Sequence, residues 1–239
     1  MLYTLNVLRR DRGADAPYWD SFSYEAVSEG DTVAAALTAI NAAAQPKNEK
    51  GEPVRPIEWE CSCLQKRCGA CAMVINGRPG LACDYKLAES KSGVLRLEPL
   101  RKFPAVCDLT VDRSILYENL KTLGVWLSAA PTLTDGDWEL AYESSGCLQC
   151  GCCLEVCPNF YADGPFFGMA TVPLTARLLT ELSPAEYRAL ARQYAKHTFA
   201  GCGKSLACKN VCPRHIDTEN LLVNANAQAI WKRKKGNRK

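Results

Sequence analysis

The distribution of cysteines constrains this chain more than any other feature of its sequence. Of 239 residues, 14 are cysteine, and all but Cys107 fall into three groups, at residues 61–83, 147–157 and 202–212. The N-terminus reaches Arg9, Arg10 and Asp11 too early to contain the apolar core of a secretory signal peptide. We therefore expect a reducing compartment, where grouped cysteines more often bind metal or act in catalysis than form disulfides.

The first group has the spacing of a plant-type [2Fe–2S] site, which is C-x4-C-x2-C followed by a later fourth cysteine. The matching residues are Cys63, Cys68, Cys71 and Cys83. Gly69 and Ala70 supply the small residues that a tight loop of thiolates needs. Zinc sites usually show two close cysteine pairs some way apart, and only one pair here has that form. The spacing therefore favours a cluster over zinc.

The second and third groups match the bacterial run C-x2-C-x2-C-x3-C-P, whose fourth cysteine binds the other cluster of a pair. The second group fits it fully and ends at Pro158, whereas the third has Ser205 in place of its second cysteine and ends at Pro213. The crossed rule then predicts a [4Fe–4S] cluster on Cys147, Cys150, Cys153 and Cys212. It predicts a [3Fe–4S] cluster on Cys157, Cys202 and Cys208, because Ser205 replaces the fourth thiolate. The intact Cys-Pro of both runs argues against a degraded site without metal.

Three cysteines remain outside these sets, namely Cys61, Cys107 and Cys152. Free cysteine is often a small buried apolar residue, and this is the first interpretation for each of them.

The hydrophobic pattern predicts an α+β chain of two domains. Residues 1–105 are expected to form a β-grasp plant-type [2Fe–2S] ferredoxin domain, with strands at 2–8, 19–27, 72–75 and 94–97 and a helix at 33–44. Gly77, Pro79 and Gly80 are expected to separate the last two strands. Residues 106–239 are expected to form an all-α bacterial-ferredoxin-like domain, with helices at 114–127, 173–182, 183–197 and 217–231.

Several function classes lack support in the sequence. The net charge of +3 is too small to indicate nucleic-acid binding, and no apolar run approaches the roughly 20 residues of a membrane span. No G-x-G-x-x-G motif is present, and neither His197 nor His215 lies in the Cys-x-His pair of a Rieske centre. No nucleophile or paired acid and base stands out. The chain is therefore expected to carry electrons without a substrate-converting site of its own.

The three cysteine motifs, in this order and over essentially the whole chain, resemble the iron–sulfur subunit of succinate dehydrogenase and fumarate reductase, the succinate:quinone oxidoreductase family. Supporting segments are Cys68–Cys71, Gly80–Cys83, Phe103–Val106, Asp108–Asp112 and Val211–Asp217. The resemblance implies partners: a flavoprotein subunit that carries FAD and interconverts succinate and fumarate, and one or two transmembrane anchor subunits, with or without haem, that bind quinone. It also implies a peripheral location on the cytoplasmic face of the cell membrane.

This sequence differs from the usual family pattern at several positions near the cysteine motifs. Leu64 and Lys66 stand where the family usually has arginine and glycine, and Gly203 stands where ubiquinone-using members often have histidine. No tryptophan closely follows Cys157-Pro158, and residues 213–217 look closer to menaquinone-linked members, so menaquinone is favoured. Family-equivalent positions place Pro158, Asn159 and Ser205 near the quinone.

The C-terminal residues 232–239 hold six basic residues in eight. They form either a solvated tail or a segment attracted to anionic lipid headgroups.

Two other functions remain open at this stage. One is a ferredoxin-like electron-transfer subunit of another flavoprotein oxidoreductase. The other is a zinc-stabilised binding module with no redox role. Co-purification with an apolar anchor separates the first from the leading interpretation, and iron content separates the second.

Overall fold

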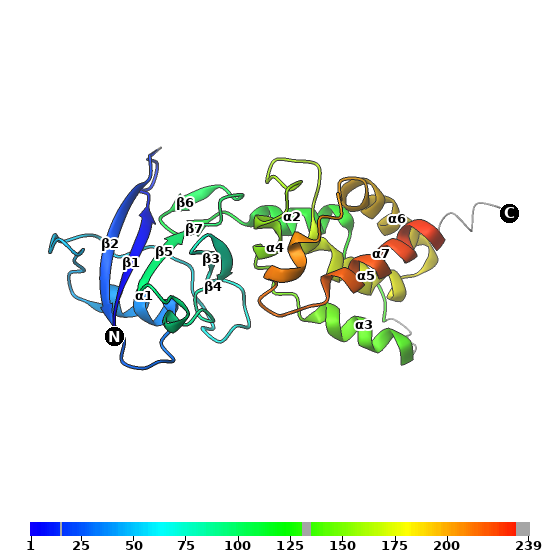
Figure 1. Ribbon diagram of the computed structural model, residues 1–239. Coiled ribbons are helices and arrows are strands. Elements are labelled where there is room, and N and C mark those ends of the chain that lie inside the picture. Colours follow the sequence, from blue (N-terminus) through cyan, green and yellow to red (C-terminus); the bar gives the residue numbers. More distant parts are fainter. Residues whose placement is uncertain (15, 131–134, 233–239) are drawn as a thin grey trace. The chain divides into compact units, whose positions relative to one another are not determined.

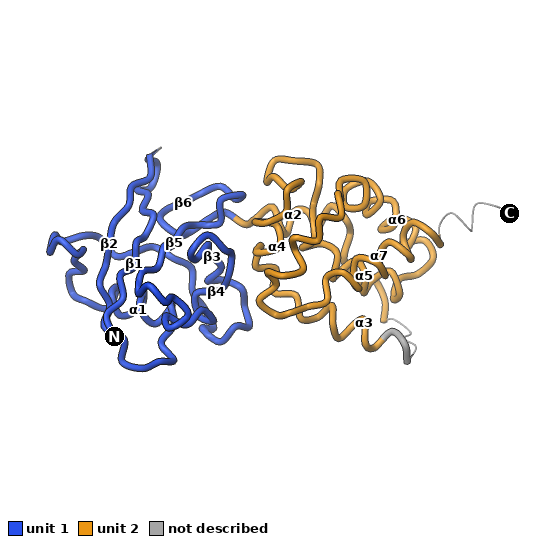
Figure 2. The backbone as a smooth tube through the Cα atoms, in the orientation of Figure 1, with its two compact units in different colours: residues 1–112 blue, residues 113–239 orange. Residues whose placement is uncertain are grey.

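The chain divides into two compact units, which Figure 2 shows in different colours. The computed structural model describes residues 1–14, 16–130 and 135–232, so most of the basic C-terminal tail lies outside the described residues. The first unit is Met1–Asp112 and the second is Arg113–Lys239. The sequence predicted a boundary between residues 105 and 106. The structure groups residues 106–112 with the first unit, for reasons given below.

The first unit is built on a five-stranded mixed sheet with the strand order β2-β1-β5-β3-β4 (Figure 1). β1 and β5 pair in parallel at its centre, and the other neighbouring strands pair antiparallel. A separate hairpin joins β6 and β7. The strands are β1 Leu2–Arg9, β2 Tyr18–Glu25, β3 Ala72–Ile75, β4 Arg78–Leu81, β5 Val94–Glu98, β6 Ala105–Cys107 and β7 Thr110–Val111.

The core of this unit follows from alternation along the strands. In β1 every second side chain is buried, from Tyr3 through Leu5 and Val7 to Arg9, because successive side chains of a strand point to opposite faces. The helix α1, Val33–Ala42, buries Val33 and Leu37. The hydroxyl of Thr32 accepts a hydrogen bond from the Ala35 amide at 3.2 Å and caps this helix.

The hairpin between β3 and β4 corrects the sequence prediction, which treated Gly77–Gly80 as a break. Asn76 and Gly77 have φ values of 49° and 80°, and Ile75 pairs directly with Arg78. This is the two-residue turn with two positive φ angles for which Asn-Gly is the preferred sequence. Pro79 is tolerated because β4 is an edge strand and its missing N–H removes no bond from the sheet interior.

The second unit is helical, and its core is formed largely by apolar faces of α5, α6 and α7 (Figure 1). The Glu186 carboxylate accepts a hydrogen bond from the Ser183 amide at 3.3 Å and closes the predicted capping box at the start of α6. The short α4 and the helix α3 were not predicted. The helices are α2 Ser114–Leu123, α3 Asp135–Ser145, α4 Cys152–Glu155, α5 Val172–Glu181, α6 Pro184–Tyr194 and α7 Thr218–Asn226.

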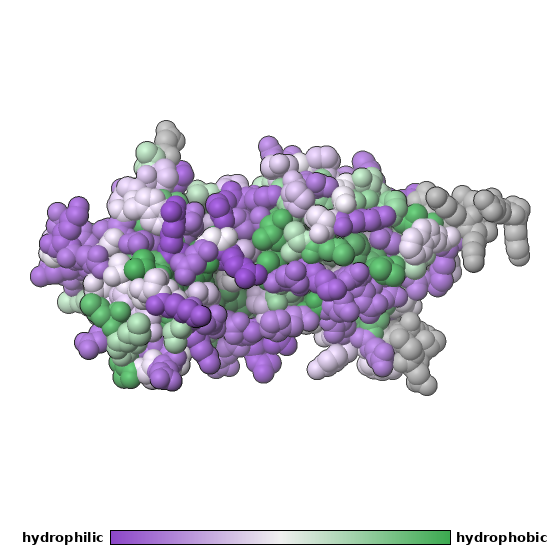
Figure 3. Space-filling model, in the orientation of Figure 1, coloured by the Kyte–Doolittle hydropathy of each residue, from purple (hydrophilic) through white to green (hydrophobic). Residues whose placement is uncertain are grey.

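The surface is mostly polar on the face drawn in Figure 3, with apolar side chains gathered near the N-terminus and over parts of the second unit. Met1, Leu2 and Val27 are exposed in the first unit, and Trp126 and Trp231 are exposed in the second. Among the described residues, no helix combines the length and apolar character needed to cross a bilayer.

Candidate iron–sulfur cluster sites

The β3–β4 hairpin places the last two cysteines of the first motif side by side. Cys71 directly precedes β3, and Cys83 follows β4 by two residues. The Ala82 amide donates to the Cys71 carbonyl oxygen at 3.0 Å, which extends the pairing of the two strands to both cysteines. Cys63 and Cys68 lie on the preceding loop. The fold therefore brings the later, isolated Cys83 back to the C-x4-C-x2-C loop.

Backbone amides of this loop point at the cysteine sulfurs. The amides of Gln65 and Arg67 donate to Cys63 Sγ at 3.3 and 3.4 Å, and the Lys66 amide donates to Cys83 Sγ at 3.3 Å. The two bonds from Gln65 and Arg67 are the main reason that the pKa of Cys63 is lowered to about 7. A loop that stabilises thiolate sulfur in this way suits the ligands of an iron–sulfur cluster.

Two non-glycine residues of this loop have a left-handed backbone conformation. Leu64 and Lys66, the two departures from the family pattern, have φ values of 53° and 57°. Glycine adopts such angles without strain, and other residues pay a conformational cost. The Lys66 side chain pairs with Asp84, the neighbour of Cys83, at 2.7 Å.

A second group of thiols lines a pocket in the second unit. Cys147, Cys150 and Cys153 come from the loop before α4 and from α4 itself, and Cys212 comes from the distant third motif. All four predicted [4Fe–4S] ligands thus face one pocket. Burial raises the pKa of Cys147 to about 11, so this thiol keeps its proton at neutral pH unless a metal displaces it.

Gln149, which the sequence analysis did not single out, contacts one of these sulfurs. Its Nε2 donates to Cys147 Sγ at 3.2 Å and to the Ala170 carbonyl oxygen at 2.8 Å. Its φ of 52° sets the direction of the side chain. No signal in the sequence reveals this contact, because it depends on that left-handed conformation.

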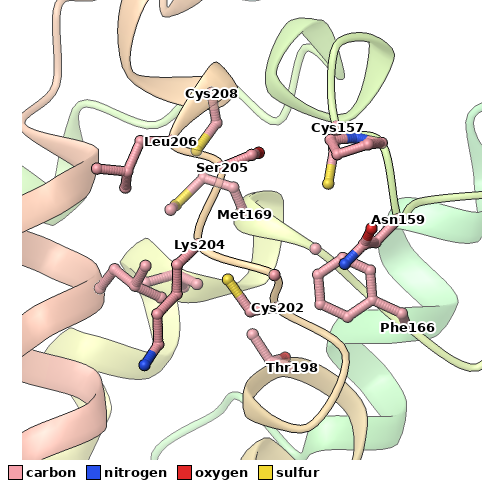
Figure 4. A pocket seen from close by; sticks show the side chains of 15 residues that line it. Cys157, Asn159, Phe166, Met169, Thr198, Cys202, Lys204, Ser205, Leu206 and Cys208 are labelled. Carbon is pink, nitrogen blue, oxygen red and sulfur yellow. The ribbon is translucent and has the colours of Figure 1, made fainter.

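A third group lines a neighbouring pocket, which is drawn in Figure 4. Cys157 follows α4, Cys202 follows a π-helical turn at Ala195–Phe199, and Cys208 lies in a 3₁₀ turn at Ala207–Val211. The three thiols and the Ser205 hydroxyl all lie on the wall of this pocket. The predicted [3Fe–4S] set and the residue at its missing ligand position are therefore brought together.

The two other residues predicted to lie near a quinone are on the same wall. Pro158 and Asn159 line the pocket beside Ser205. The Asn159 Nδ2 donates to the Gly201 carbonyl oxygen at 2.7 Å and so ties the segment after Cys157 to the segment before Cys202. A Cβ at Gly203 would lie 3.0 Å from Asn159 Nδ2, so this close approach suits glycine.

The remaining cysteines line neither pocket. Cys61 is exposed, and Cys107 is buried with its thiol donating to the Arg10 carbonyl oxygen at 3.2 Å. Cys152 is buried and hydrogen-bonds Cys150, which lowers the pKa of Cys150 to about 7. Within residues 1–14, 16–130 and 135–232, no three or more histidine, cysteine, aspartate or glutamate side chains are set to hold a single metal ion.

The donor sets fit the groups that their spacing predicts. Each pocket of the second unit borders the buried apolar core, against which Cys147, Cys153, Cys202, Cys208 and Cys212 pack. Thiolate ligands in apolar surroundings, with amide donors near the sulfurs, are the features by which proteins hold such clusters and set their potentials.

Comparison with known proteins agrees with this arrangement. Residues 4–118 match the family model described as a 2Fe-2S iron-sulfur cluster binding domain, and residues 143–216 match a 4Fe-4S dicluster domain. The fold also matches a chain of the Mycobacterium smegmatis Sdh1 complex in the apo form, with a TM-score of 0.78 over 97% of both chains at 24% identity. Together the fold and the sites define an iron–sulfur electron-transfer protein of two ferredoxin-type domains.

Similarity to named proteins narrows the class to one family. The succinate dehydrogenase iron-sulfur subunit of Bacillus subtilis is 33% identical over 92% of this chain and 89% of that protein. The fumarate reductase iron-sulfur subunit of Haemophilus influenzae is 30% identical over 73% of this chain and 75% of that protein. The chain belongs to the family of succinate dehydrogenase and fumarate reductase iron–sulfur subunits. This result sets aside the zinc-stabilised binding module.

Proposed function

We propose that this chain relays electrons between a flavoprotein subunit, which carries FAD and interconverts succinate and fumarate, and a quinone bound at a membrane anchor. The observation that carries the proposal is the crossing of the two distant cysteine motifs. Cys212 joins the pocket of the second motif, and Cys157 joins the pocket of the third. Two adjoining pockets, each of which takes one cysteine from the motif that forms the other, are typical of a two-cluster ferredoxin module.

The proposed ligand sets follow the three sites. Cys63, Cys68, Cys71 and Cys83 hold [2Fe–2S], and Cys147, Cys150, Cys153 and Cys212 hold [4Fe–4S]. Cys157, Cys202 and Cys208 hold [3Fe–4S], with Ser205 beside the position that lacks iron. Each bound cluster supplies a one-electron redox centre. The chain itself supplies deprotonated sulfur ligands, the amide donors around Cys63 and Cys83, and the apolar residues packed against the two sites of the second unit.

The quinone end of the relay is assigned to the pocket of Cys157, Cys202 and Cys208. Pro158, Asn159 and Ser205 line this pocket, and these are the positions that the family resemblance places near quinone. Menaquinone is the favoured quinone, because the segment after Cys157-Pro158 lacks tryptophan and Gly203 replaces the histidine of many ubiquinone-using members. One or two transmembrane anchor subunits, with or without haem, hold the chain at the cytoplasmic face of the cell membrane.

The test uses the purified complex and a matched pair of cysteine-to-serine variants. Cys157→Ser is expected to remove the [3Fe–4S] signal and to abolish electron transfer from succinate to a menaquinone analogue. Transfer to a dye that accepts electrons at the flavoprotein is expected to persist. Cys61→Ser, at an exposed residue that lines neither pocket, is expected to retain both activities. Normal quinone reduction by Cys157→Ser would contradict the proposed relay.

A further inference from the structure

The Gln149 side chain bridges one proposed ligand of the [4Fe–4S] site, Cys147, and the backbone of Ala170, and it uses both of its amide protons. Nε2 donates to Cys147 Sγ at 3.2 Å and to the Ala170 carbonyl oxygen at 2.8 Å. The second bond anchors the amide to the 3₁₀ turn at Met169–Thr171, whose backbone helps to wall the same pocket. The amide is therefore fixed with its donor end against the sulfur.

The carbonyl oxygen of the Gln149 side-chain amide shows that this orientation lowers the stability of the fold. Oε1 is buried and has no hydrogen-bond partner among the described residues, and a buried polar atom without a partner is destabilising. The backbone adds to the cost, because Gln149 has a φ of 52°. Glycine or asparagine adopts this left-handed conformation more readily. Glycine has no side-chain donor, however, and the asparagine side chain is one methylene too short to make the same two hydrogen bonds.

Backbone strain at a residue next to a cluster-binding cysteine is typical of a functional position. Here the strained backbone and the unpartnered oxygen both accompany one contact, the N–H to sulfur bond. A hydrogen bond to a ligand sulfur stabilises the reduced site more than the oxidised one, because reduction adds negative charge to the iron and its sulfur ligands. In low-dielectric surroundings such a bond acts more strongly than in water.

We infer that Gln149 is a positioning residue that raises the midpoint potential of the [4Fe–4S] site by holding an N–H donor against Cys147 Sγ. The inference rests on the proposed function, since it requires Cys147 to be a ligand. Gln149 then helps to determine how readily the [4Fe–4S] site accepts an electron.

The test is a redox titration of the purified complex, followed by electron paramagnetic resonance at low temperature. Gln149→Leu removes the donor at similar size, and Gln149→Glu replaces it by an acceptor. At the wild-type midpoint, we expect the ratio of reduced to oxidised [4Fe–4S] to fall about three- to tenfold in Gln149→Leu and further in Gln149→Glu. A tenfold change corresponds to about 59 mV for one electron. The [2Fe–2S] midpoint is expected to stay unchanged in both.

Two further variants separate tuning from a structural role. Gln149→Gly relieves the left-handed strain, so we expect unchanged or higher thermal stability together with the lowered potential. The matched control Gln193→Leu changes a glutamine of α6 that lines neither pocket and is expected to leave the potential unchanged. Unchanged [4Fe–4S] midpoints in Gln149→Leu and Gln149→Gly would overturn the inference, and so would loss of the cluster from all three Gln149 variants.

Failure of the proposed ligand set gives a different result. Cys147→Ser is expected to remove or strongly perturb the [4Fe–4S] signal. A normal signal in Cys147→Ser would refute the ligand assignment itself, whatever the Gln149 variants show.

Discussion

Asp108 is the centre of a buried charge network, and its removal is expected to destabilise the first unit strongly. Its carboxylate has no exposed side-chain surface and lies 3.0 Å from Arg9 Nε, on a guanidinium that is equally buried. Arg55 binds it with two nitrogens, at 2.6 and 2.8 Å. The amides of Arg10 and Glu58 also donate to it, each at 2.9 Å. These bonds connect β1, the segment before the first cysteine motif, and the turn between β6 and β7.

The magnitude follows from what Asp108→Ala leaves behind. Removing one partner of a buried ion pair typically costs about 3–5 kcal/mol, because the other charge stays buried. Arg9 would keep a longer ion pair with Asp20, at 3.9 Å, and hydrogen bonds to the Arg55 and Pro56 carbonyl oxygens, so we expect a loss near the lower end of this range. For a unit of this size the loss corresponds to a fall of about 12 °C or more in melting temperature. The matched control is Arg12→Ala, which removes an ion pair with Glu58 that is largely exposed and is expected to change little.

The same carboxylate predicts a pH dependence. Burial alone would raise the pKa of Asp108, but hydrogen bonds from Arg55 and Arg9 outweigh it and hold the pKa below its ordinary value. The folded state therefore binds this proton more weakly than the unfolded state, whose carboxyl titrates near pH 4. The stabilisation is fully present above that pH and is lost as the pH falls through the folded pKa.

Urea unfolding followed by circular dichroism at pH 7 and near pH 3 measures both effects on the full chain. We expect Asp108→Asn to flatten the acid-induced loss of stability relative to wild type. An Asp108→Ala variant no less stable than Arg12→Ala at pH 7 would show that the buried Arg9 does not depend on Asp108.

Three further predictions concern other parts of the chain. Ser205→Cys supplies a fourth thiol to the third site, so iron should rise by about one atom per chain and the oxidised [3Fe–4S] resonance should disappear. Gly168→Ala should lower the free energy of unfolding by about 1–3 kcal/mol, since its Cβ would overlap Leu154 Cδ2 at a φ of +72°; chemical denaturation measures the loss. Lys66→Gly relieves the left-handed backbone and removes the ion pair with Asp84. It should keep the [2Fe–2S] absorption spectrum and stabilise the first unit by up to about 1 kcal/mol, and loss of the spectrum would contradict this.

The elements that the sequence predicts well carry strong periodicity or fixed spacing. β3 at Ala72–Ile75 agrees with the prediction residue for residue, and the Ser183 capping box starts α6 as expected. The elements that the pattern does not predict have weak or conflicting signals. The Asn-Gly turn indicates a hairpin, but Pro79 and Gly80 are both unfavourable in a strand and obscure β4. α3 begins Asp-Gly-Asp and has no apolar stripe that would predict a helix.

The division between the units shows what a pattern of residues cannot reveal. Residues 105–111 form a hairpin that the charge network of Asp108 and the thiol contact of Cys107 tie to β1. These contacts span almost a hundred residues, so no local pattern predicts them. The same contrast holds for the candidate site. The cysteine spacing predicts the ligands, whereas the contact between Gln149 and Cys147 depends on a backbone angle that only the three-dimensional structure reveals.

The proposed relay requires three different iron–sulfur clusters in this chain, one of which has three iron atoms because Ser205 replaces the fourth thiol. Low-temperature electron paramagnetic resonance of the purified complex, with iron and zinc measured alongside, tests it most directly. We expect about nine iron atoms per chain. We also expect a near-isotropic resonance in the oxidised sample, which disappears on reduction with dithionite while a [2Fe–2S] resonance appears. An oxidised sample without a resonance and with about ten iron atoms per chain, or zinc in place of iron, would contradict this expectation.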